Sequence, residues 1–339
     1  MEKKLIRFSS SATQFYFDGS LRELSAVCSP ESTILLTDEN VYSAHKGKFR
    51  GWKTIIVEPG EQFKNQATAD KVIAQMISLK ADRTTTLVGI GGGVITDLAG
   101  YIGGIYMRGI RVGFVPTSIL AMVDASIGGK NGIDVGVYKN LVGLIRQPDF
   151  LLYDTSLLKS LPEEEWINGM AEIIKHAAIR DAAMFRQLEA TTLPKLKRNK
   201  ETLNALIRRN ALLKVKVVLA DEFEKNERRL LNFGHTIGHA IENHYSLKHG
   251  FAIARGMVAA AALSRKLLGY RDSERLANLI AQYGLPTDQD FDRKAALDVL
   301  GMDKKREKST MNFVLLEKTG KAVVHPIAMN ELGDLVNSI

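Results

Sequence analysis

The feature that most constrains the fold is an apolar run from Thr84 to Ile90 that ends directly in three consecutive glycines, Gly91, Gly92 and Gly93. A continuous run of apolar and β-branched residues is typical of a strand buried on both faces, and such strands occur mainly in parallel sheets under helices. The glycines then indicate a tight turn from this strand into a helix. The segment therefore predicts a doubly wound α/β sheet.

The rest of the chain extends this prediction into two parts. Further strands are predicted at Thr33–Thr37, Lys53–Val57, Arg111–Val115 and Phe150–Tyr153, with a helix from Asn65 to Lys80. After Asp154 the apolar period changes to 3.6 residues. It predicts helices at Glu163–Leu188, Lys200–Asp221, Leu231–Tyr245, Ile253–Leu268, Ser273–Tyr283 and Arg293–Leu300, and one hairpin with Thr319 and Gly320 at its turn. We expect a Rossmann-like, mostly parallel domain over residues 1–158 and a mainly α-helical domain over residues 159–339.

Composition excludes several classes of protein. A formal net charge of +8 fits anionic small molecules, and since no basic run is interleaved with aromatics, we expect no nucleic-acid partner. No segment has about 18 uncharged apolar residues, and the first ten residues lack an apolar core, so we expect neither a membrane span nor a signal peptide. Cys28 is the single cysteine, which fits a reducing cytoplasm.

The glycine turn is a candidate phosphate site. It does not match the dinucleotide fingerprint GxGxxG, but a glycine-rich turn exposes backbone N–H groups at a helix N-terminus, where phosphate binds well. The alternative is a tight turn with no ligand. Polar residues at the ends of neighbouring predicted strands favour a ligand, because they would lie beside the turn. They are Asp38, Asn40, Glu61, Lys64 and, after the turn itself, Asp97.

Four of the seven histidines fall within fifteen residues: His235, His239, His244 and His249. His235 and His239 are one helical turn apart, so they could bind a divalent metal together. The metalloprotease motif is excluded, because Thr236 stands where that motif has its glutamate. Glu172 is a candidate third ligand, and its alternative role is a salt bridge to Lys175 or Lys216.

Cations beside glycines or carboxylates suit a substrate with phosphate and carboxylate groups, although each alone could be a solvated surface charge. They are Arg108, Lys130, Lys139, Lys175, Lys214, Arg228, Lys304 and Lys305. Asn232, three residues before His235, is expected on a neighbouring face of the same helix and could orient that ligand.

Together, several motifs resemble the 3-dehydroquinate synthases, from about Leu35 to Leu316. They are GGGVITDLAGY, YMRG, VPTSILAMVDASIGGKNGID, YKNLVGLIRQP, GMAEIIKHA, LNFGHTIGHA, HGFAIARGM and MDKK. The resemblance implies catalytic NAD and zinc or cobalt. It implies that the metal is held by Glu172, His235 and His249, which replaces the pairing of His235 with His239.

The resemblance also implies the remaining site residues. The NAD shell becomes Asp38, Asn40, Glu61, Lys64, Gly91, Gly92, Gly93, Val94, Asp97, Thr117 and Ser118, with Lys130 and Lys139. The substrate ligands become Asp124, Lys130, Lys139, Asn140, Lys175, Lys214, Arg228, Asn232, His239 and one of Lys304 or Lys305. Arg108 would reach the phosphate in a neighbouring subunit's site, which implies a homodimer.

The implied reaction converts 3-deoxy-D-arabino-heptulosonate 7-phosphate into 3-dehydroquinate and phosphate. It proceeds by transient oxidation, β-elimination, re-reduction, ring opening and aldol closure, and the site is expected in a cleft between the two domains. Two residues depart from the common family pattern: Phe251, where many members have glutamate, and Asn131, where threonine is common. The alternatives are another sugar-phosphate cyclase such as 2-deoxy-scyllo-inosose synthase, a glycerol dehydrogenase-type enzyme with net NAD turnover, and a non-catalytic nucleotide-binding regulator.

Overall fold

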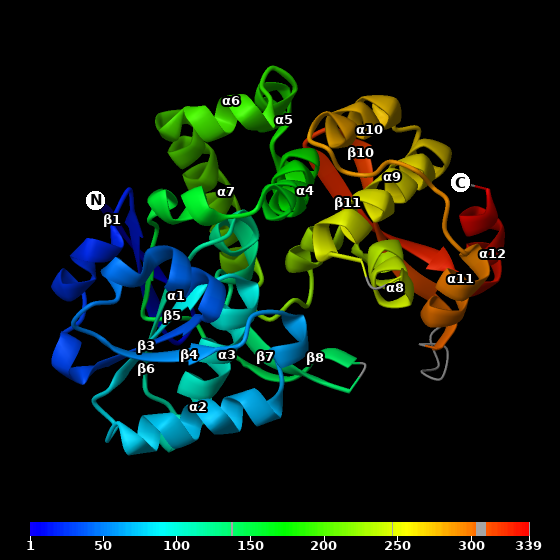
Figure 1. The fold of residues 1–339 in the computed structure, drawn as a ribbon. Helices are drawn as coiled ribbons and strands as arrows, with labels where there is room; N and C mark the ends of the chain where they lie inside the picture. Colours follow the sequence, from blue (N-terminus) through cyan, green and yellow to red (C-terminus); the bar gives the residue numbers. More distant parts are fainter. Residues whose placement is uncertain (137, 246, 303–309, 339) are drawn as a thin grey trace. The chain divides into compact units, whose positions relative to one another are not determined.

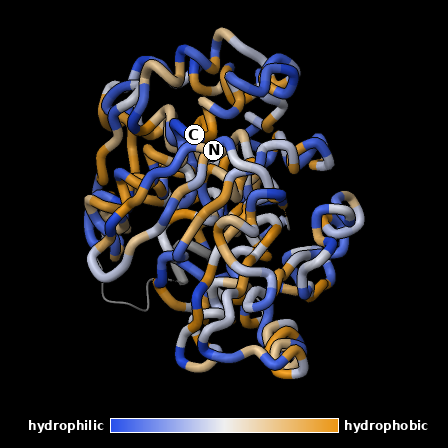
Figure 2. The backbone as a smooth tube through the Cα atoms, turned by 90° about the vertical axis from the view of Figure 1, so that its left-hand side faces the viewer, coloured by the Kyte–Doolittle hydropathy of each residue, from blue (hydrophilic) through white to orange (hydrophobic). Residues whose placement is uncertain are grey.

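The computed structural model describes residues 1–136, 138–245, 247–302 and 310–338 (Figure 1). Internal contacts divide the chain into two compact units, which are described separately below. The first comprises Met1–Glu165 with Asn204–Phe223, and the second comprises Trp166–Leu203 with Glu224–Ile339. Among the described residues, no helix is both long and apolar enough to cross a membrane. Hydrophobic and hydrophilic stretches are accordingly interspersed along the whole backbone (Figure 2).

The first unit is built on a seven-stranded sheet in the order β1-β2-β9-β6-β5-β3-β4. Its strands are β1 (Glu2–Arg7), β2 (Ala12–Phe17), β3 (Thr33–Asp38), β4 (Lys53–Val57), β5 (Thr86–Gly91), β6 (Arg111–Pro116) and β9 (Phe150–Leu152). Neighbouring strands are parallel except for the antiparallel pair β1 and β2. Every residue of β5 is buried, as its continuous apolar run predicts.

The helices α1 (Glu39–His45), α2 (Gln66–Ser78) and α3 (Gly93–Ile105) pack against the strands of this sheet. The unit also contains most of α7 (Lys200–Ala220) and the short helices η1 (Leu21–Ala26), η2 (Pro30–Ser32), η3 (Lys46–Lys48), η4 (Glu61–Phe63), η5 (Tyr106–Arg108), η6 (Ala121–Ala125) and η7 (Thr155–Ser160). The chain passes from β3 through α1 to β4 on one side of β3, and from β5 through α3 to β6 on the other side of β5. Because right-handed crossovers in opposite directions use opposite faces, α1 and α3 lie on different faces. The boundary between β3 and β5 is therefore a topological switch point, where doubly wound sheets bind ligands.

A hairpin of β7 (Lys130–Val135) and β8 (Tyr138–Ile145) packs against α3 in the first unit. The hairpin lies close to α3 because the side of α3 that faces the hairpin carries glycines. A Cβ at Gly100 would lie 1.9 Å from Oδ1 of Asn131, and one at Gly104 would lie 2.6 Å from Leu144. The side chain of Asn131 also donates to the carbonyl oxygens of Gly129 and Arg146. Asn131, one of the two departures from the family pattern, thus ties the two ends of the hairpin together and packs against Gly100 of the helix.

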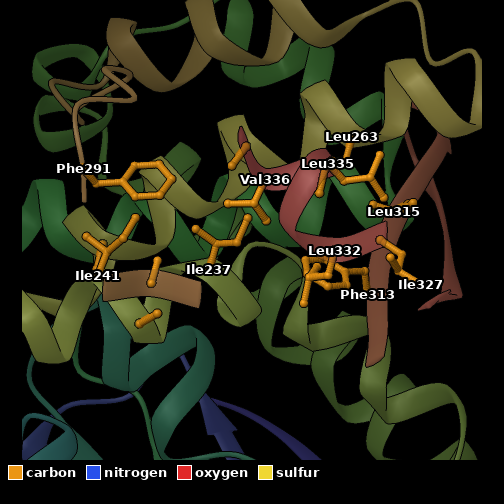
Figure 3. Close-up of a cluster of buried hydrophobic side chains, with 14 residues drawn as sticks. Ile237, Ile241, Leu263, Phe291, Phe313, Leu315, Ile327, Leu332, Leu335 and Val336 are labelled. Atoms are coloured by element: carbon orange, nitrogen blue, oxygen red, sulfur yellow. The ribbon is translucent and has the colours of Figure 1, made fainter. Parts of the chain in front are cut away.

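The second unit is mainly helical. Its elements are α4 (Glu163–Arg180), α5 (Ala182–Glu189), α6 (Leu193–Arg198), η8 (Glu227–Asn232), α8 (His235–Tyr245), α9 (His249–Leu268), α10 (Ser273–Gln282), α11 (Arg293–Met302), α12 (Met329–Asn337) and the hairpin of β10 (Thr310–Lys318) and β11 (Lys321–Ala328). Figure 3 shows Ile237 and Ile241 of α8 in its core, which also contains Leu263, Phe313, Leu315, Ile327, Leu332, Leu335 and Val336. The buried face of α8 fixes the direction in which its other face, with His235 and His239, points.

The predicted fold class is confirmed: a mostly parallel, doubly wound sheet is followed by a mainly helical part. Several predicted boundaries were wrong. The helix expected at Glu163–Leu188 is interrupted at Asp181, whose side chain accepts from the backbone N–H of Met184 and begins a new helix. The helix expected from Leu231 begins at His235, because Gly234 has φ of 78° and separates it from η8. The helix expected from Ile253 begins earlier, at His249.

Candidate functional site

The glycine turn lies at the carboxyl end of β5 and opens α3. Gly91 has no room for a side chain, because a Cβ there would lie 2.5 Å from Cβ of Ile95. Gly92 is the N-cap of the helix, and no side chain caps the first turn. The N-terminus of a 13-residue helix is thus presented at the switch point, with backbone N–H groups suited to an anion.

Lys64 is the centre of a charged cluster beside this turn. Its Nζ lies 2.6 Å from Glu61, 3.5 Å from Asp97 and 3.7 Å from Asp134, and it donates to Oδ1 of Asn140 at 2.9 Å. Burial alone would lower the pKa of Lys64, but Asp97 and Glu61 outweigh burial and hold that pKa above its usual value. Burial raises the pKa of Asp97 to about 7, although Lys64 opposes the shift.

The other residues predicted around the cofactor lie on the same edge of the sheet. Asp38 ends β3 and caps α1 by accepting from the N–H of Val41 at 2.9 Å. Burial raises the pKa of its carboxyl group. Asn40 is exposed in the first turn of α1, and Thr117 and Ser118 are buried directly after β6. The structure therefore brings the ends of β3, β5 and β6, with their polar residues, to one edge of the first unit.

Three potential metal ligands converge in the second unit. One ligand atom each of Glu172, His235 and His249 lie within 4.8 Å of one another. Oε1 of Glu172 is 3.7 Å from Nε2 of His235 and 3.5 Å from Nε2 of His249. The side chain of Glu172 is fully buried, whereas those of the two histidines are 12% and 28% exposed. Two imidazoles and one carboxylate form the ligand set of many catalytic zinc sites, which leave a fourth position open.

The far nitrogen of each of these imidazoles is also engaged. Nδ1 of His235 lies 3.2 Å from the carbonyl oxygen of Phe233, and Nδ1 of His249 lies 3.1 Å from Oε2 of Glu242. A carbonyl oxygen can only accept, so Nδ1 of His235 carries the proton and its Nε2 keeps a lone pair toward Glu172. This is how proteins orient histidines that bind metals, so the residues fit a divalent cation.

Glycines allow the two histidine-bearing helices to approach each other. A Cβ at Gly256 of α9 would lie 1.9 Å from the carbonyl oxygen of Gly234, just before α8. A Cβ at Gly250, next to His249, would lie 2.0 Å from the carbonyl oxygen of Asn168 on α4. The N–H of Gly250 also donates to Oδ1 of Asn168 at 2.7 Å. Backbone contact, which only glycine permits at these positions, therefore places His235 and His249 near Glu172.

The surrounding charges shift the pKa values of the two histidines in opposite directions. Burial and the nearby Lys175 lower the pKa of His235 well below its usual value. For His249, burial also lowers the pKa, but Glu172 and Glu242 outweigh it and raise the value to about 9. Nζ of Lys175 contacts the Glu172 carboxylate directly. The salt bridge of Glu172 to Lys175, considered from the sequence as an alternative, is therefore present together with the histidine cluster.

Some of the residues predicted to bind substrate lie in the first unit. Lys214 donates to Oδ1 of Asp124 at 2.7 Å and to the carbonyl oxygen of the same residue. Lys130 and Lys139 are exposed on the β7–β8 hairpin, and Arg108 is exposed at the end of η5 with φ of 68°. Val94, predicted near the cofactor, is half-buried in the first turn of α3.

Others lie in the second unit. Arg228 is buried in η8, and Asn232 donates to Oε1 of Glu224 at 2.8 Å. The prediction that Asn232 shares a helix with His235 is wrong, because Gly234 separates them. The ring of exposed His239 is centred 5.1 Å from that of His235, and His239 forms a second possible metal group with Glu242 and His249. Lys304 and Lys305 lie outside the described residues.

Three residues with clear contacts were missed from the sequence. Asp134 contacts Lys64 and accepts from the N–H of Asn140, Glu242 contacts His249, and Asn168 holds Gly250. Glu242 had a usable signal: it is a carboxylate in a histidine-rich helix, seven residues before His249. Asp134 and Asn168 had none, since a polar residue near glycines is common in loops and helix ends.

Comparison with known families matches both parts of the chain. Residues 54–168 match the model of the 3-dehydroquinate synthase N-terminal region, and residues 169–306 match that of the C-terminal region. The 3-dehydroquinate synthase of Pyrococcus abyssi is 40% identical over 275 residues, which cover 80% of this chain and 81% of that protein.

Solved structures agree in fold. A 2-deoxy-scyllo-inosose synthase solved with carbaglucose-6-phosphate, NAD+ and Co2+ superposes with a TM-score of 0.83 at 24% identity, covering 99% of this chain and 100% of that one. The 2-epi-5-epi-valiolone synthase of Streptomyces hygroscopicus subsp. jinggangensis, solved with NAD+ and Zn2+, gives a TM-score of 0.87 at 21% identity, covering 99% and 98%. These likenesses concern the fold, whereas the sequence matches identify the family. The chain belongs to the 3-dehydroquinate synthase family.

Proposed function

We propose that this chain converts 3-deoxy-D-arabino-heptulosonate 7-phosphate into 3-dehydroquinate and phosphate, as a carbon–oxygen lyase of the shikimate route to aromatic amino acids. The observation that carries the proposal is the convergence of Glu172, His235 and His249 within 4.8 Å. In a chain of this family, that ligand set supports a catalytic divalent metal, Zn2+ or Co2+. When bound, the metal would supply Lewis acidity toward a substrate hydroxyl, and NAD would supply a hydride acceptor that is regenerated in each turnover.

The residues of the first unit support NAD binding. The N–H groups at the start of α3 suit a pyrophosphate, and Gly91, Gly92 and Gly93 let it approach the backbone. The carboxylates of Asp38 and Glu61 suit ribose hydroxyls, which are hydrogen-bond donors. Lys64, held among carboxylates, positions Asn140 and Asp97 beside the turn. We accordingly propose an NAD-binding domain over residues 1–158 and a metal- and substrate-binding domain over residues 159–339.

The cations support binding of a substrate that carries phosphate and carboxylate groups. We assign this role to Lys130, Lys139, Lys175, Lys214 and Arg228, with Asp124, Asn140, Asn232, His239 and one of Lys304 or Lys305. These side chains orient the substrate and neutralise the phosphate as it leaves by β-elimination, so that one set of fixed charges serves successive steps. The buried Arg228 supplies a planar pair of donors suited to a carboxylate.

We further propose that the protein acts as a homodimer in the cytoplasm, with Arg108 contributing to the partner's site. Large apolar side chains are exposed on the β7–β8 hairpin and on the adjoining end of α3 and η5, next to Arg108. They are Val135, Tyr138, Leu141, Val142, Ile145, Ile105 and Met107. Large apolar side chains exposed on neighbouring elements are typical of a protein–protein interface. The single cysteine, Cys28, fits the reducing cytoplasm.

The test measures phosphate release from the heptulosonate phosphate, in parallel with NADH absorbance. Turnover with phosphate release and no net NADH supports the proposal. Steady accumulation of NADH would instead indicate a dehydrogenase. Because the chain also has the fold of 2-deoxy-scyllo-inosose synthase, glucose 6-phosphate is the second substrate. Faster phosphate release from glucose 6-phosphate would replace the proposal with that related cyclase activity.

A further inference from the structure

A basic hollow of about 830 Å³ lies in the first unit, apart from the residues assigned to cofactor, metal and substrate. It is lined by η1, the end of α1, η3 and the loop that leads into β4. Its charged lining consists of Arg22, Lys46, Lys48 and Arg50, and no carboxylate lines it. Four cations around one concavity without an acidic residue create a positive potential that attracts anions.

Three of these cations have no acidic partner among the described residues. Lys48 donates to Asp154 and Ser156, each at 2.9 Å, so its charge is balanced within the fold. In contrast, Arg22, Lys46 and Arg50 form no ion pair with any residue that the structure describes. Like charges close together repel each other, and their repulsion is relieved when an anion binds among them. The positive charges of these three residues are therefore available to bind an anionic ligand.

The remaining lining supplies other contacts that a phosphate-bearing molecule requires. Gly47 and Gly51 have open space where a side chain would be, and Gly51 has φ of 88°, so a ligand can approach the backbone there. Ser25 and Ser43 provide hydroxyl groups. Half-buried Trp52 contributes an aromatic surface that packs against the core on its other side. Guanidinium groups bind phosphate bidentately, and an aromatic surface stacks on planar rings.

We propose that this hollow is a second anion site, which binds a small phosphate-bearing molecule with a planar ring. A concave site with a single tryptophan suits a small ligand better than a nucleic acid, which requires an extended basic surface with several stacking residues. The inference goes beyond the proposed function and does not depend on it, because its readout is binding at Trp52.

The first test follows the indole N–H signals of the two tryptophans, Trp52 and Trp166, by NMR during titration with pyrophosphate and with phenyl phosphate. Trp166 lies in the other unit and serves as the internal reference. We expect a saturable shift of the Trp52 signal alone. The shift should reach saturation at a lower concentration of phenyl phosphate than of pyrophosphate. No saturable shift of the Trp52 signal, or equal shifts of both signals, would overturn the proposal.

The second test compares two triple variants of equal net charge. The first replaces Arg22, Lys46 and Arg50 by Gln, and the second replaces Arg7, Lys71 and Arg83, which are exposed elsewhere in the first unit, by Gln. We expect the first variant to lose about tenfold or more in affinity for phenyl phosphate at Trp52 and the second to retain it. Equal losses would show only a general charge effect and refute the site. Preferential binding of an oligonucleotide over phenyl phosphate would identify a nucleic-acid surface instead.

Discussion

Nδ1 of His249 lies 3.1 Å from Oε2 of Glu242, while Nε2 of the same ring lies 3.5 Å from Glu172. The carboxylate of Glu242 thus orients the His249 ring. The carboxylate of Glu172 lies on the other side of that ring, where the metal would bind. Carboxylate–histidine pairs of this kind fix the orientation of the ring and increase the basicity of the ligand. Glu242 is therefore a positioning residue for the candidate metal site.

Glu242→Gln should weaken metal binding by about 10- to 100-fold, because the amide keeps an acceptor for Nδ1 but loses the charge. Competition with a chelator, followed by measurement of bound metal, gives the affinity. Glu331→Gln, at an exposed position of α12, is the matched control and should bind metal as the wild type does. Unchanged affinity in the Glu242 variant would show that the contact does not support the site.

His249→Ala should abolish stoichiometric metal binding, since it removes one of three ligands. His239→Ala should retain the metal and lose activity, because we assign His239 to the substrate. Metal content and activity are measured on the same samples. Loss of the metal from both variants would instead favour the group formed by His239, Glu242 and His249, and a His249 variant that keeps its metal would exclude both groups.

Gly256→Ala should destabilise the second unit by about 3 kcal/mol or more and weaken metal binding, because its Cβ would lie 1.9 Å from the backbone oxygen of Gly234. Urea unfolding and metal content provide the two readouts. Gly333→Ala is the control: it lies within α12, has no neighbour within 4 Å of its Cβ, and should be neutral or stabilise slightly. Full stability of the Gly256 variant would contradict the close approach of α8 and α9.

Sequence patterns predicted the parallel strands β3 to β6 well. The ranges of β3, β5 and β6 were predicted to within two residues, because strands buried on both faces are continuous apolar runs. The range of β4 was predicted correctly, although it is an edge strand with only two buried residues. The strands β1, β2, β7 and β8 were missed. Of these, β1 and β8 are largely exposed, glycines interrupt β7 and β8, and β2 has a buried face that the prediction overlooked. The exposed strands β1 and β8 have no buried face and therefore no periodic apolar signal.

The candidate metal site illustrates a different limit. Local spacing favoured His235 with His239, since both lie one turn apart on a helix. The structure instead places His235 and His249 beside Glu172, which is 63 residues before His235 in the sequence. Such a group depends on the close backbone contacts at Gly234, Gly250 and Gly256, which no helical period encodes. The grouping came from the family resemblance. The structure places its three ligand atoms within 4.8 Å of one another, and their role as metal ligands stays a prediction.

Asp97 should make the stability of the NAD-free protein depend on pH. Its pKa is raised to about 7 in the folded state, so between about pH 4 and 7 the folded protein binds more protons than the unfolded chain. The Asp97 contribution to stability is therefore lost as pH rises through this window. Asp97→Asn should leave stability near pH 4 unchanged and increase it by about 4 kcal/mol at pH 8.

Urea unfolding of wild type and variant at both pH values measures this difference. Asp70→Asn, an exposed carboxylate on α2, is the control and should show no pH-dependent gain. A gain at pH 4 equal to that at pH 8 would mean that Asp97 does not titrate in this range. A loss of stability at pH 8 would mean that its ion pair with Lys64 outweighs the cost of burial.

Mixed subunits test whether Arg108 acts in a neighbouring site. Arg108→Ala and Lys130→Ala should each be nearly inactive alone, since each removes a proposed phosphate contact. If Arg108 serves the partner's site, a mixed dimer contains one intact site and one that lacks both residues. Random mixing in equal amounts then restores about a quarter of the wild-type activity. Activity is measured after the subunits have been dissociated and reassembled, with each variant treated alone as the control. If both residues serve the same subunit's site, no mixture recovers activity.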